Sequence, residues 1–136
     1  MSKTFNIRVY GVLEESGEIL ILKEPFAGEI IYKFPGGGLE FGEGTTECLK
    51  REFREELNLD IEIENHIYTQ DYFLQSRLDE NEQILMIYYK IKAKDISQLQ
   101  VLDSDIRELV WKPKHAIQHS DLSLPTDQLI VEQYLK

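Results

Sequence analysis

Hydrophobic and polar residues alternate along the first part of the chain in a pattern that predicts β-strands. Residues 5–13 and 19–23 are rich in apolar and β-branched side chains, and a Glu-Ser-Gly turn sequence separates them. This arrangement is typical of a β-hairpin. A third short strand is expected over residues 30–34, ending before Pro35. The glycines at 36–38 suit neither a helix interior nor a strand ladder, so we expect a loop there.

The next segment has the four-residue apolar repeat of a helix, which we predict over residues 46–57. The repeat consists of Leu49, Phe53 and Leu57. Thr45 offers a hydroxyl that can cap the first turn, and Asn58 suits the left-handed conformation that commonly ends a helix. One face of this helix is therefore expected to pack on the core.

Alternation returns in the second half of the chain and predicts a second hairpin. Residues 61–74 and 83–93 form its strands on either side of a polar segment. A short strand is expected over residues 108–112, and residues 122–135 are expected to close the chain as a helix. These elements predict an α/β fold with a mixed sheet. The length fits a single domain spanning residues 1–136.

Three glutamates, Glu52, Glu55 and Glu56, lie on a face of the predicted helix that adjoins its apolar face. Two carboxylates about 6 Å apart repel by about 3 kcal/mol at an effective dielectric near 20, so the helix needs a compensating charge. A divalent cation supplies it, and an oxygen ligand set without His or Cys suits Mg²⁺ or Mn²⁺ rather than Zn²⁺. Arg51 can pair with Glu55 or with Glu43, and we expect it to brace the carboxylates rather than to clamp a substrate.

The spacing of these residues resembles the Nudix box, G-x5-E-x7-R-E-U-x-E-E-x-G-U, in which U is a bulky apolar residue. The matching positions are Gly37, Glu43, Arg51, Glu52, Phe53, Glu55, Glu56 and Leu59. Asn58 replaces the last glycine of the pattern, and we expect the chemistry to survive because Asn tolerates the same backbone conformation. The glycine run before the box and residues 111–113 also resemble the family, so the resemblance covers essentially the whole chain.

The resemblance implies a Nudix-type α/β/α sandwich in which the box forms a loop, a helix and a loop. It also implies an enzyme that hydrolyses the pyrophosphate bond of a nucleoside diphosphate linked to another moiety X. Substrates of this class include nucleotide sugars, ADP-ribose and nucleoside triphosphates, so the expected partner is a small molecule. By the same resemblance Glu52, Glu55 and Glu56, with the backbone carbonyl of Gly36, coordinate Mg²⁺. The other box residues expected at the catalytic centre are Glu43 and Arg51.

The sequence leaves the proton acceptor and the substrate contacts open. Glu52 is the favoured acceptor for the proton of the attacking water. The candidates outside the box are Glu80, Glu82, Asp103 and Asp105. Tyr32 could stack on a base, and Arg8 or Lys33 could meet a phosphate or a ribose.

Composition narrows the choice of partner and compartment. The 15 basic and 25 acidic side chains give a net charge of −10, which disfavours binding to extended nucleic acid. No apolar run approaches the roughly 20 residues that cross a bilayer, and the first residues lack the apolar stretch of a secretory signal, so we expect no membrane partner. Cys48 is the only cysteine, which excludes an intramolecular disulfide and favours the reducing cytoplasm. The oligomeric state stays open, a homodimer included.

Two other functions are compatible with the same motif. A Nudix-fold sensor module would bind a nucleotide without cleaving it, but such modules commonly have eroded box glutamates, and here all are present. The second is hydrolysis of the pyrophosphate bond at an RNA 5′ end. The acidic composition disfavours RNA as a substrate but does not exclude it, because only one terminal nucleotide has to enter the site. The identities of X and of the base depend on loops and strand faces that vary within a fold, so the sequence leaves them open.

Overall fold

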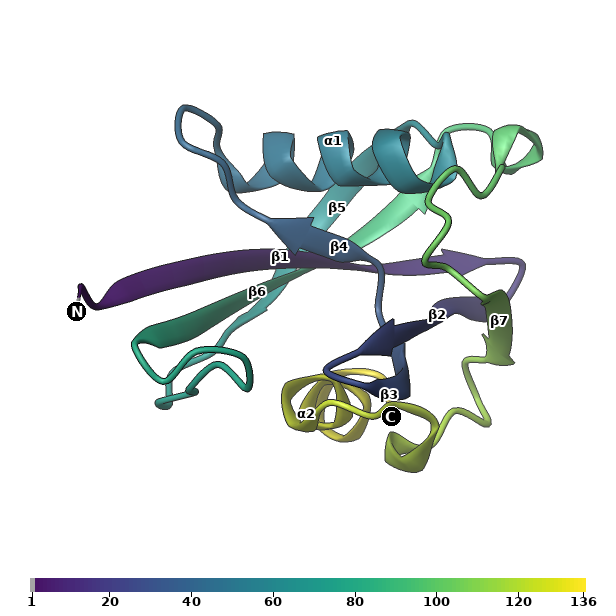
Figure 1. The fold of residues 1–136 in the computed structure, drawn as a ribbon. Coiled ribbons are helices and arrows are strands. Elements are labelled where there is room, and N and C mark those ends of the chain that lie inside the picture. Colours follow the sequence, from purple (N-terminus) through teal and green to yellow (C-terminus); the bar gives the residue numbers. More distant parts are fainter. Residues whose placement is uncertain (1) are drawn as a thin grey trace.

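A computed structural model describes residues 2–136, which form one mixed sheet with a helix on each face (Figure 1). The strands are β1 (Thr4–Glu15), β2 (Glu18–Phe26), β3 (Glu29–Lys33), β4 (Gly36–Gly38), β5 (Ile61–Thr69), β6 (Glu82–Ala93) and β7 (Glu108–Pro113). The helical elements are α1 (Thr45–Leu57), α2 (Pro125–Tyr134) and the short 3₁₀ turns η1 (Ile96–Gln98) and η2 (His119–Asp121). Helix α1 covers one face of the sheet and α2 the other, which confirms the predicted α/β/α sandwich.

Strand β1 is the element around which the sheet is built. The strand order is β3-β2-β1-β6-β5, with β4 beside β1 and β7 beside β2. β1 runs parallel to β6 from Thr4 to Leu13, whereas the other pairings among the described strands are antiparallel. The predicted hairpin of β1 and β2 is therefore confirmed, and so is the mixed character of the sheet.

The glycine segment forms a strand where the sequence predicted a loop. β4 pairs with β1 so that Gly37 lies opposite Val9. A Cβ atom on Gly36 would lie 2.1 Å from the carbonyl oxygen of Val9, and Gly36 has a φ of +154° that side chains rarely tolerate. The prediction was wrong because the absence of side chains, which weakens most strands, here lets the backbone approach β1 closely enough to pair.

Alternate residues of β1 point into two separate cores. Val9 and Leu13 belong to the core beneath α1, whereas Tyr10 and Val12 belong to the core on the side of α2. The helix residues predicted to face the core are at most 1% exposed: Leu49, Phe53 and Leu57. The core-facing side chains of β1, which recur every second residue, therefore pack against those of α1, which recur every fourth residue.

The ends of α1 show which capping predictions hold. The N-cap position is occupied by Gly44 and not by Thr45, and the Glu47 carboxylate accepts a hydrogen bond from the Gly44 N–H at 2.8 Å. The Thr45 hydroxyl instead lies 2.6 Å from the hydroxyl of Tyr89. Asn58 ends the helix with φ 55° and ψ 33°, so its predicted left-handed conformation is confirmed.

Two other predicted boundaries were wrong. β5 ends at Thr69 rather than at residue 74, because the side chain of Gln70 accepts a hydrogen bond from Met86 N at 3.0 Å beyond the last ladder pair. Helix α2 begins at Pro125 rather than at Leu122, since proline lacks an N–H and has the φ of a first helical residue.

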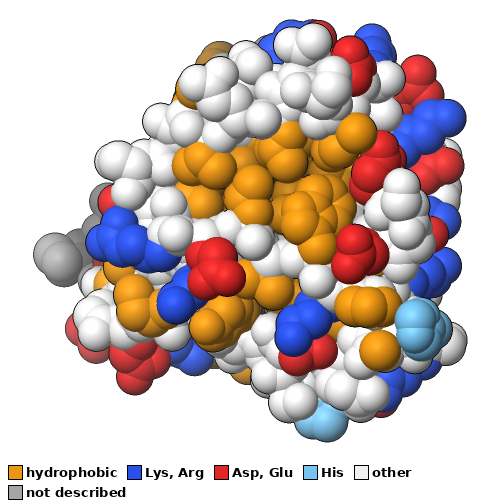
Figure 2. All heavy atoms as spheres, turned by 90° about the vertical axis from the view of Figure 1, so that its right-hand side faces the viewer, with side chains coloured by type: hydrophobic (Ala, Val, Ile, Leu, Met, Phe, Trp, Pro, Cys, Tyr) orange, Lys and Arg blue, Asp and Glu red, His pale blue; other side chains and the backbone are white. Residues whose placement is uncertain are grey.

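The surface on the side of β7 carries apolar side chains at its centre (Figure 2). Val101 and Leu102, in the segment that leads into β7, are among the exposed large apolar residues. Within residues 2–136, none of the helices has the length and hydropathy needed to span a bilayer.

Candidate active site

The three box glutamates differ in how far they reach into solvent. The Glu55 side chain is 56% exposed, whereas that of Glu52 is 15% exposed. Glu56 lies one residue before the buried Leu57 and is itself partly buried. Glu52 and Glu56 are therefore partly buried, whereas Glu55 points more toward solvent.

Strand β4 forms the floor against which Glu52 lies. A Cβ atom on Gly37 would be 2.3 Å from Cδ of Glu52 and 2.5 Å from its Oε1. The carboxylate therefore occupies the volume that any side chain at position 37 would fill. The first glycine of the box is required because of this contact, and Gly36 lies beside it in the same strand.

Arg51 holds the carboxylates and the glycine segment together. Its guanidinium donates to Glu43 through two atoms, from Nε to Oε2 at 3.0 Å and from Nη2 to Oε1 at 2.7 Å. Nη1 donates to Glu52 Oε1 at 2.9 Å and to Glu55 Oε2 at 3.3 Å. Nη2 also donates to the carbonyl oxygen of Gly38 at 3.0 Å. All three nitrogen atoms of the guanidinium are thus engaged within the box, which supports the brace interpretation.

The same contacts stabilise the ionised form of Glu43. Hydrogen bonds from Arg51 and from the backbone N–H of Glu40 lower the pKa of Glu43 to about 2. The pKa of Arg51 is raised by its hydrogen bond with Glu43. This pair therefore keeps both charges throughout the physiological pH range.

Glu56 has the opposite environment. Burial raises the pKa of Glu56 to about 8, with Lys33 acting against the shift and the carboxylates of Glu52, Glu24 and Asp103 adding to it. Burial is thus the main cause of the shift, and repulsion from the neighbouring carboxylates adds to it. A bound cation at this place would relieve that repulsion.

Glu24 is a site residue that the sequence interpretation missed. It lies on β2 with its Oε1 3.9 Å from Lys33 Nζ, and its Oε2 is buried without a hydrogen-bond partner among the described residues. The available signal was the alternation of β2, because Leu20 and Leu22 face the core and a glutamate follows at the next position of that face. A charge at a position that alternation assigns to the core marks a functional candidate.

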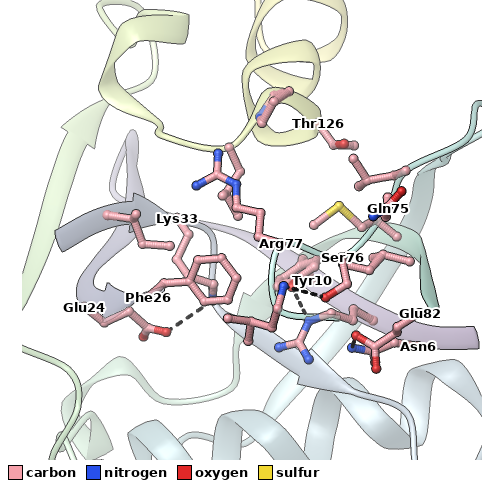
Figure 3. A pocket seen from close by; sticks show the side chains of 18 residues that line it. Asn6, Tyr10, Glu24, Phe26, Lys33, Gln75, Ser76, Arg77, Glu82 and Thr126 are labelled. Carbon is pink, nitrogen blue, oxygen red and sulfur yellow. Dashed lines mark hydrogen bonds and ion pairs between the residues drawn. The ribbon is translucent and has the colours of Figure 1, made fainter. Parts of the chain in front are cut away.

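A pocket of about 220 Å³ opens next to these charges. Figure 3 shows Lys33 and Glu24 at one end of it, Asn6 and Glu82 at the other, and Tyr10 between them. Several lining residues are apolar: Phe26, Ile31, Leu74, Leu78, Ile84, Met86 and Leu124. An apolar lining with a few polar groups is typical of small-molecule sites.

The structure brings two of the three predicted substrate contacts to this pocket. Arg8 and Lys33 line it, and the charge of Arg8 also interacts with those of Glu52 and Glu56. Arg8 Nε donates to the Tyr10 hydroxyl at 2.6 Å. These two cations therefore lie between the pocket and the box carboxylates.

Tyr32 is not among the pocket-lining residues. Strand alternation turns its ring away from Ile31 and Lys33, and Lys23 Nζ lies 6.0 Å from the ring centroid. Its predicted stacking on a base is therefore not supported by this arrangement.

The four carboxylates considered outside the box lie in different places. Glu82 lines the pocket, and Asp103 lies close enough to Glu56 to influence its ionisation. Glu80 and Asp105 belong neither to the pocket lining nor to the groups that act on Glu56.

The residues present fit a hard divalent cation, although no group of three His, Cys, Asp or Glu side chains within residues 2–136 converges as a ready-made metal site. Glu52 and Glu55 are hydrogen-bonded to Arg51, and Glu24 Oε2 has no partner in the described part of the chain. Carboxylate oxygens of this kind suit Mg²⁺ or Mn²⁺.

Comparisons with known proteins identify the family of this chain. A family model described as the NUDIX domain matches residues 3–133. The nucleoside triphosphatase NudI of Enterobacter sp. is 27% identical over 124 residues, covering 85% of this chain and 86% of NudI. The protein of the same name from Escherichia coli is 30% identical over 95 residues, covering 67% of each chain.

Solved structures share the fold. The solution structure of the E. coli ORF135 protein aligns with a TM-score of 0.78 at 20% identity, covering 98% of this chain and 90% of that one. The crystal structure of a MutT NUDIX hydrolase from Burkholderia pseudomallei aligns with a TM-score of 0.74 at 19% identity, covering 96% and 98%.

Proposed function

The chain belongs to the NUDIX family and is a pyrophosphohydrolase, and we propose that it cleaves the pyrophosphate bond of a small nucleotide with the help of a divalent cation. The observation that carries this proposal is the placement of Arg8 and Lys33 between an apolar pocket and the carboxylates of α1. A nucleoside bound in the pocket would direct its phosphates past these cations toward Glu52 and Glu56.

The substrate class we propose is a nucleoside diphosphate linked to another group, with a nucleoside triphosphate as one member. The NudI relatives, which are called nucleoside triphosphatases, favour that member. A net charge of −10 repels free polyphosphates, so the local cations and a bound metal ion have to provide the attraction.

We propose that Glu52, Glu55 and Glu56, with the backbone carbonyl of Gly36, hold Mg²⁺ or Mn²⁺. When bound, such an ion neutralises charge on pyrophosphate oxygens and lowers the pKa of water. Arg51 holds Glu52 and Glu55 by hydrogen-bonding to them directly, and it ties the helix to Glu43 and Gly38.

We propose Glu52 as the acceptor of the proton from the attacking water. Its carboxylate lies against the backbone of Gly37 and accepts from Arg51, so its position is defined from two sides. Asp103, beside Glu56, and Glu82, in the pocket wall, are the alternatives that the structure leaves near the site.

We also propose that the enzyme works in the cytoplasm as one domain. Cys48 is a buried free thiol, which is the form expected of an isolated cysteine in a reducing compartment. Burial and the nearby Glu43 raise the pKa of Cys48 to about 12, so the thiol is inert.

The test is a substrate screen with Mg²⁺ or Mn²⁺, using nucleoside triphosphates, nucleotide sugars, ADP-ribose and dinucleoside polyphosphates. Separate detection of nucleoside monophosphate, pyrophosphate and orthophosphate identifies the bond that is cleaved. We expect divalent-dependent release of a monophosphate from at least one compound. Folded protein that turns over none of them contradicts the proposed substrate class, and full turnover in excess EDTA contradicts the metal requirement.

A further inference from the structure

A buried carboxylate on α2 contacts the residues that lead into the active site. Asp127 is 0% exposed, accepts a hydrogen bond from the Tyr88 hydroxyl, and accepts a second from the backbone N–H of Phe34 at 3.3 Å. It lies neither in the box nor in the lining of the pocket. A buried acid with two donors but no role in the site described so far calls for a functional account.

Phe34 connects this carboxylate to Lys33. The Lys33 ammonium, whose residue is only 5% exposed, donates to the carbonyl oxygen of Phe34 at 2.9 Å. The backbone N–H of Phe34 is thus hydrogen-bonded to Asp127, and the backbone C=O of Phe34 is hydrogen-bonded to Lys33. The two residues after Phe34 lead directly into Gly37, which supports Glu52.

Asp127 also contributes charge. Lys33 has a single ion-pair partner in the described part of the chain, Glu24, and that contact is 3.9 Å long. The Asp127 carboxylate interacts with the Lys33 charge as well, and this attraction lowers the cost of burying the ammonium.

Three neighbouring groups favour the ionised form of Asp127. Burial raises the pKa of Asp127 to about 6, while the hydrogen bond from Tyr88, the charge of Lys33 and the N–H of Phe34 act in the opposite direction. An apolar residue in a well-packed core often stabilises a fold as well as a buried charge does, so stability alone does not explain this acid.

We propose that Asp127 is a positioning residue that holds Lys33 and Phe34 in place for binding of the substrate's phosphates. This inference rests on the proposed function, in which Lys33 meets the pyrophosphate. It assigns to α2 a part in phosphate binding that operates through β3 and requires no contact between Asp127 and the nucleotide.

The test compares Asp127→Asn with a matched control, Tyr88→Phe. Asparagine has nearly the same shape and keeps an acceptor for Phe34 but removes the charge. Phenylalanine at position 88 removes the other hydrogen bond and leaves both the charge and the Phe34 contact. Both variants lose part of one buried interaction, so a purely structural role predicts similar kinetic effects for the two.

We expect Asp127→Asn to raise KM about 10-fold while kcat changes less than about 2-fold, and Tyr88→Phe to leave both within about 2-fold. Lys33→Met should raise KM as well, and the double variant with Asp127→Asn should be no worse than Lys33→Met alone. The proposal would be overturned if the effects of Asp127→Asn and Lys33→Met on KM multiplied in the double variant. It would also be overturned if Tyr88→Phe raised KM as much as Asp127→Asn does.

A measurement on the unmodified protein covers the case in which Asp127→Asn fails to fold. Inorganic pyrophosphate with Mg²⁺ is titrated into ¹⁵N-labelled protein, and the amide signals of Phe34 and of Gly37 are followed. We expect both to shift, because the pyrophosphate would meet Lys33, which bonds to Phe34. A shift at Gly37 without one at Phe34 overturns the role of Asp127 but not the proposed function. No shift at either amide overturns both.

Discussion

At the scale of single residues, the active site depends on how its carboxylates are compensated. Arg51 hydrogen-bonds to Glu43, Glu52 and Glu55 directly, whereas the sequence led us to expect a pairing with Glu43 or Glu55 only. Glu56 has no such hydrogen bond from Arg51 and instead lies near Glu24 and Asp103, which oppose its ionisation. The two environments divide the box into a part braced by Arg51 and a part, at Glu56, in which ionisation is disfavoured.

The first residue-scale prediction concerns Glu56. Glu56→Gln should lower kcat/KM by at least about 10²-fold because it removes a charged oxygen ligand, while the fold survives because no core volume is lost. Kinetics at saturating Mg²⁺, together with a thermal melt, provide the measurement. Glu64→Gln, at an exposed position of β5, is the control and should stay within about 2-fold of the unmodified enzyme. Near-normal activity of folded Glu56→Gln would contradict the assignment.

The second residue-scale prediction separates a brace from a substrate clamp. Arg51→Lys keeps the charge but loses the planar fork that bonds Glu43 at two atoms, so the glutamates should be held loosely and bind metal more weakly. The rate should fall at fixed Mg²⁺ and partly recover as Mg²⁺ is raised, with KM for the substrate little changed at saturating metal. Both parameters are measured across a Mg²⁺ series. A KM defect that persists at every Mg²⁺ concentration would show that Arg51 touches the substrate.

At the scale of elements, predictions succeeded where the signal was local. The apolar repeat of α1 and the left-handed Asn58 follow from a few neighbouring residues, and both were confirmed. The glycine segment was misread because its pairing with β1 depends on residues about 28 positions earlier, such as Val9 opposite Gly37. Its role as a floor for Glu52 is likewise a tertiary contact that composition does not reveal.

That floor leads to an element-scale prediction about β4. Gly37→Ala would place a methyl group 2.3 Å from Cδ of Glu52, so the carboxylate must move, and displacement of about 1 Å at a catalytic centre can reduce the rate about 10²-fold. Gly38→Ala is the matched control in the same strand, because its Cβ would lie 3.6 Å from Arg8 Nη1 and 3.8 Å from Asn6 Oδ1, which are ordinary contact distances.

Kinetics and circular dichroism of the two alanine variants provide the measurement. We expect both to retain the sheet, with Gly38→Ala within about 3-fold of normal activity. Equal activities for the two variants would mean that the contact between Gly37 and Glu52 does not matter for catalysis.

At the scale of the whole molecule, the site is assembled from segments that are distant in sequence. The pocket draws Arg8 from β1, Lys33 from β3, Glu82 from β6 and Thr126 from α2, while the carboxylates come from α1. The box could be recognised from its spacing because it is one continuous segment. The pocket could not be predicted, because its residues come together only through the parallel pairing of β1 and β6 and the packing of α2. Tyr32 is a different case, because alternation within the predicted strand already implied that its side chain and that of Lys33 point to opposite faces.

Burial of the Glu56 carboxylate also affects the stability of the whole fold. The pKa of Glu56 is raised from an ordinary value of 4.5 to about 8. Between these values the unfolded chain has lost this proton while the folded chain keeps it, so the folded state binds more protons and its stability falls as pH rises. Asp127, with its pKa raised to about 6, contributes with the same sign at the lower end of this range.

We therefore predict that protein kept free of metal with EDTA is more stable near pH 5 than near pH 8. One pKa unit corresponds to about 1.4 kcal/mol, so we expect the free energy of unfolding to fall by at least about 1 kcal/mol across that interval. Denaturant titrations at several pH values measure this free energy.

Glu56→Gln is the control that isolates this carboxylate. It removes the titrating group but leaves Asp127 and the other charged residues, so the pH dependence of its stability should be shallower. Adding Mg²⁺ should stabilise the unmodified protein more at pH 8 than at pH 5, because Glu56 is more often ionised at pH 8 and the ion displaces fewer protons. Identical pH profiles for the unmodified protein and Glu56→Gln would show that Glu56 is ionised without cost in the folded protein, and would remove this electrostatic argument for a cation site.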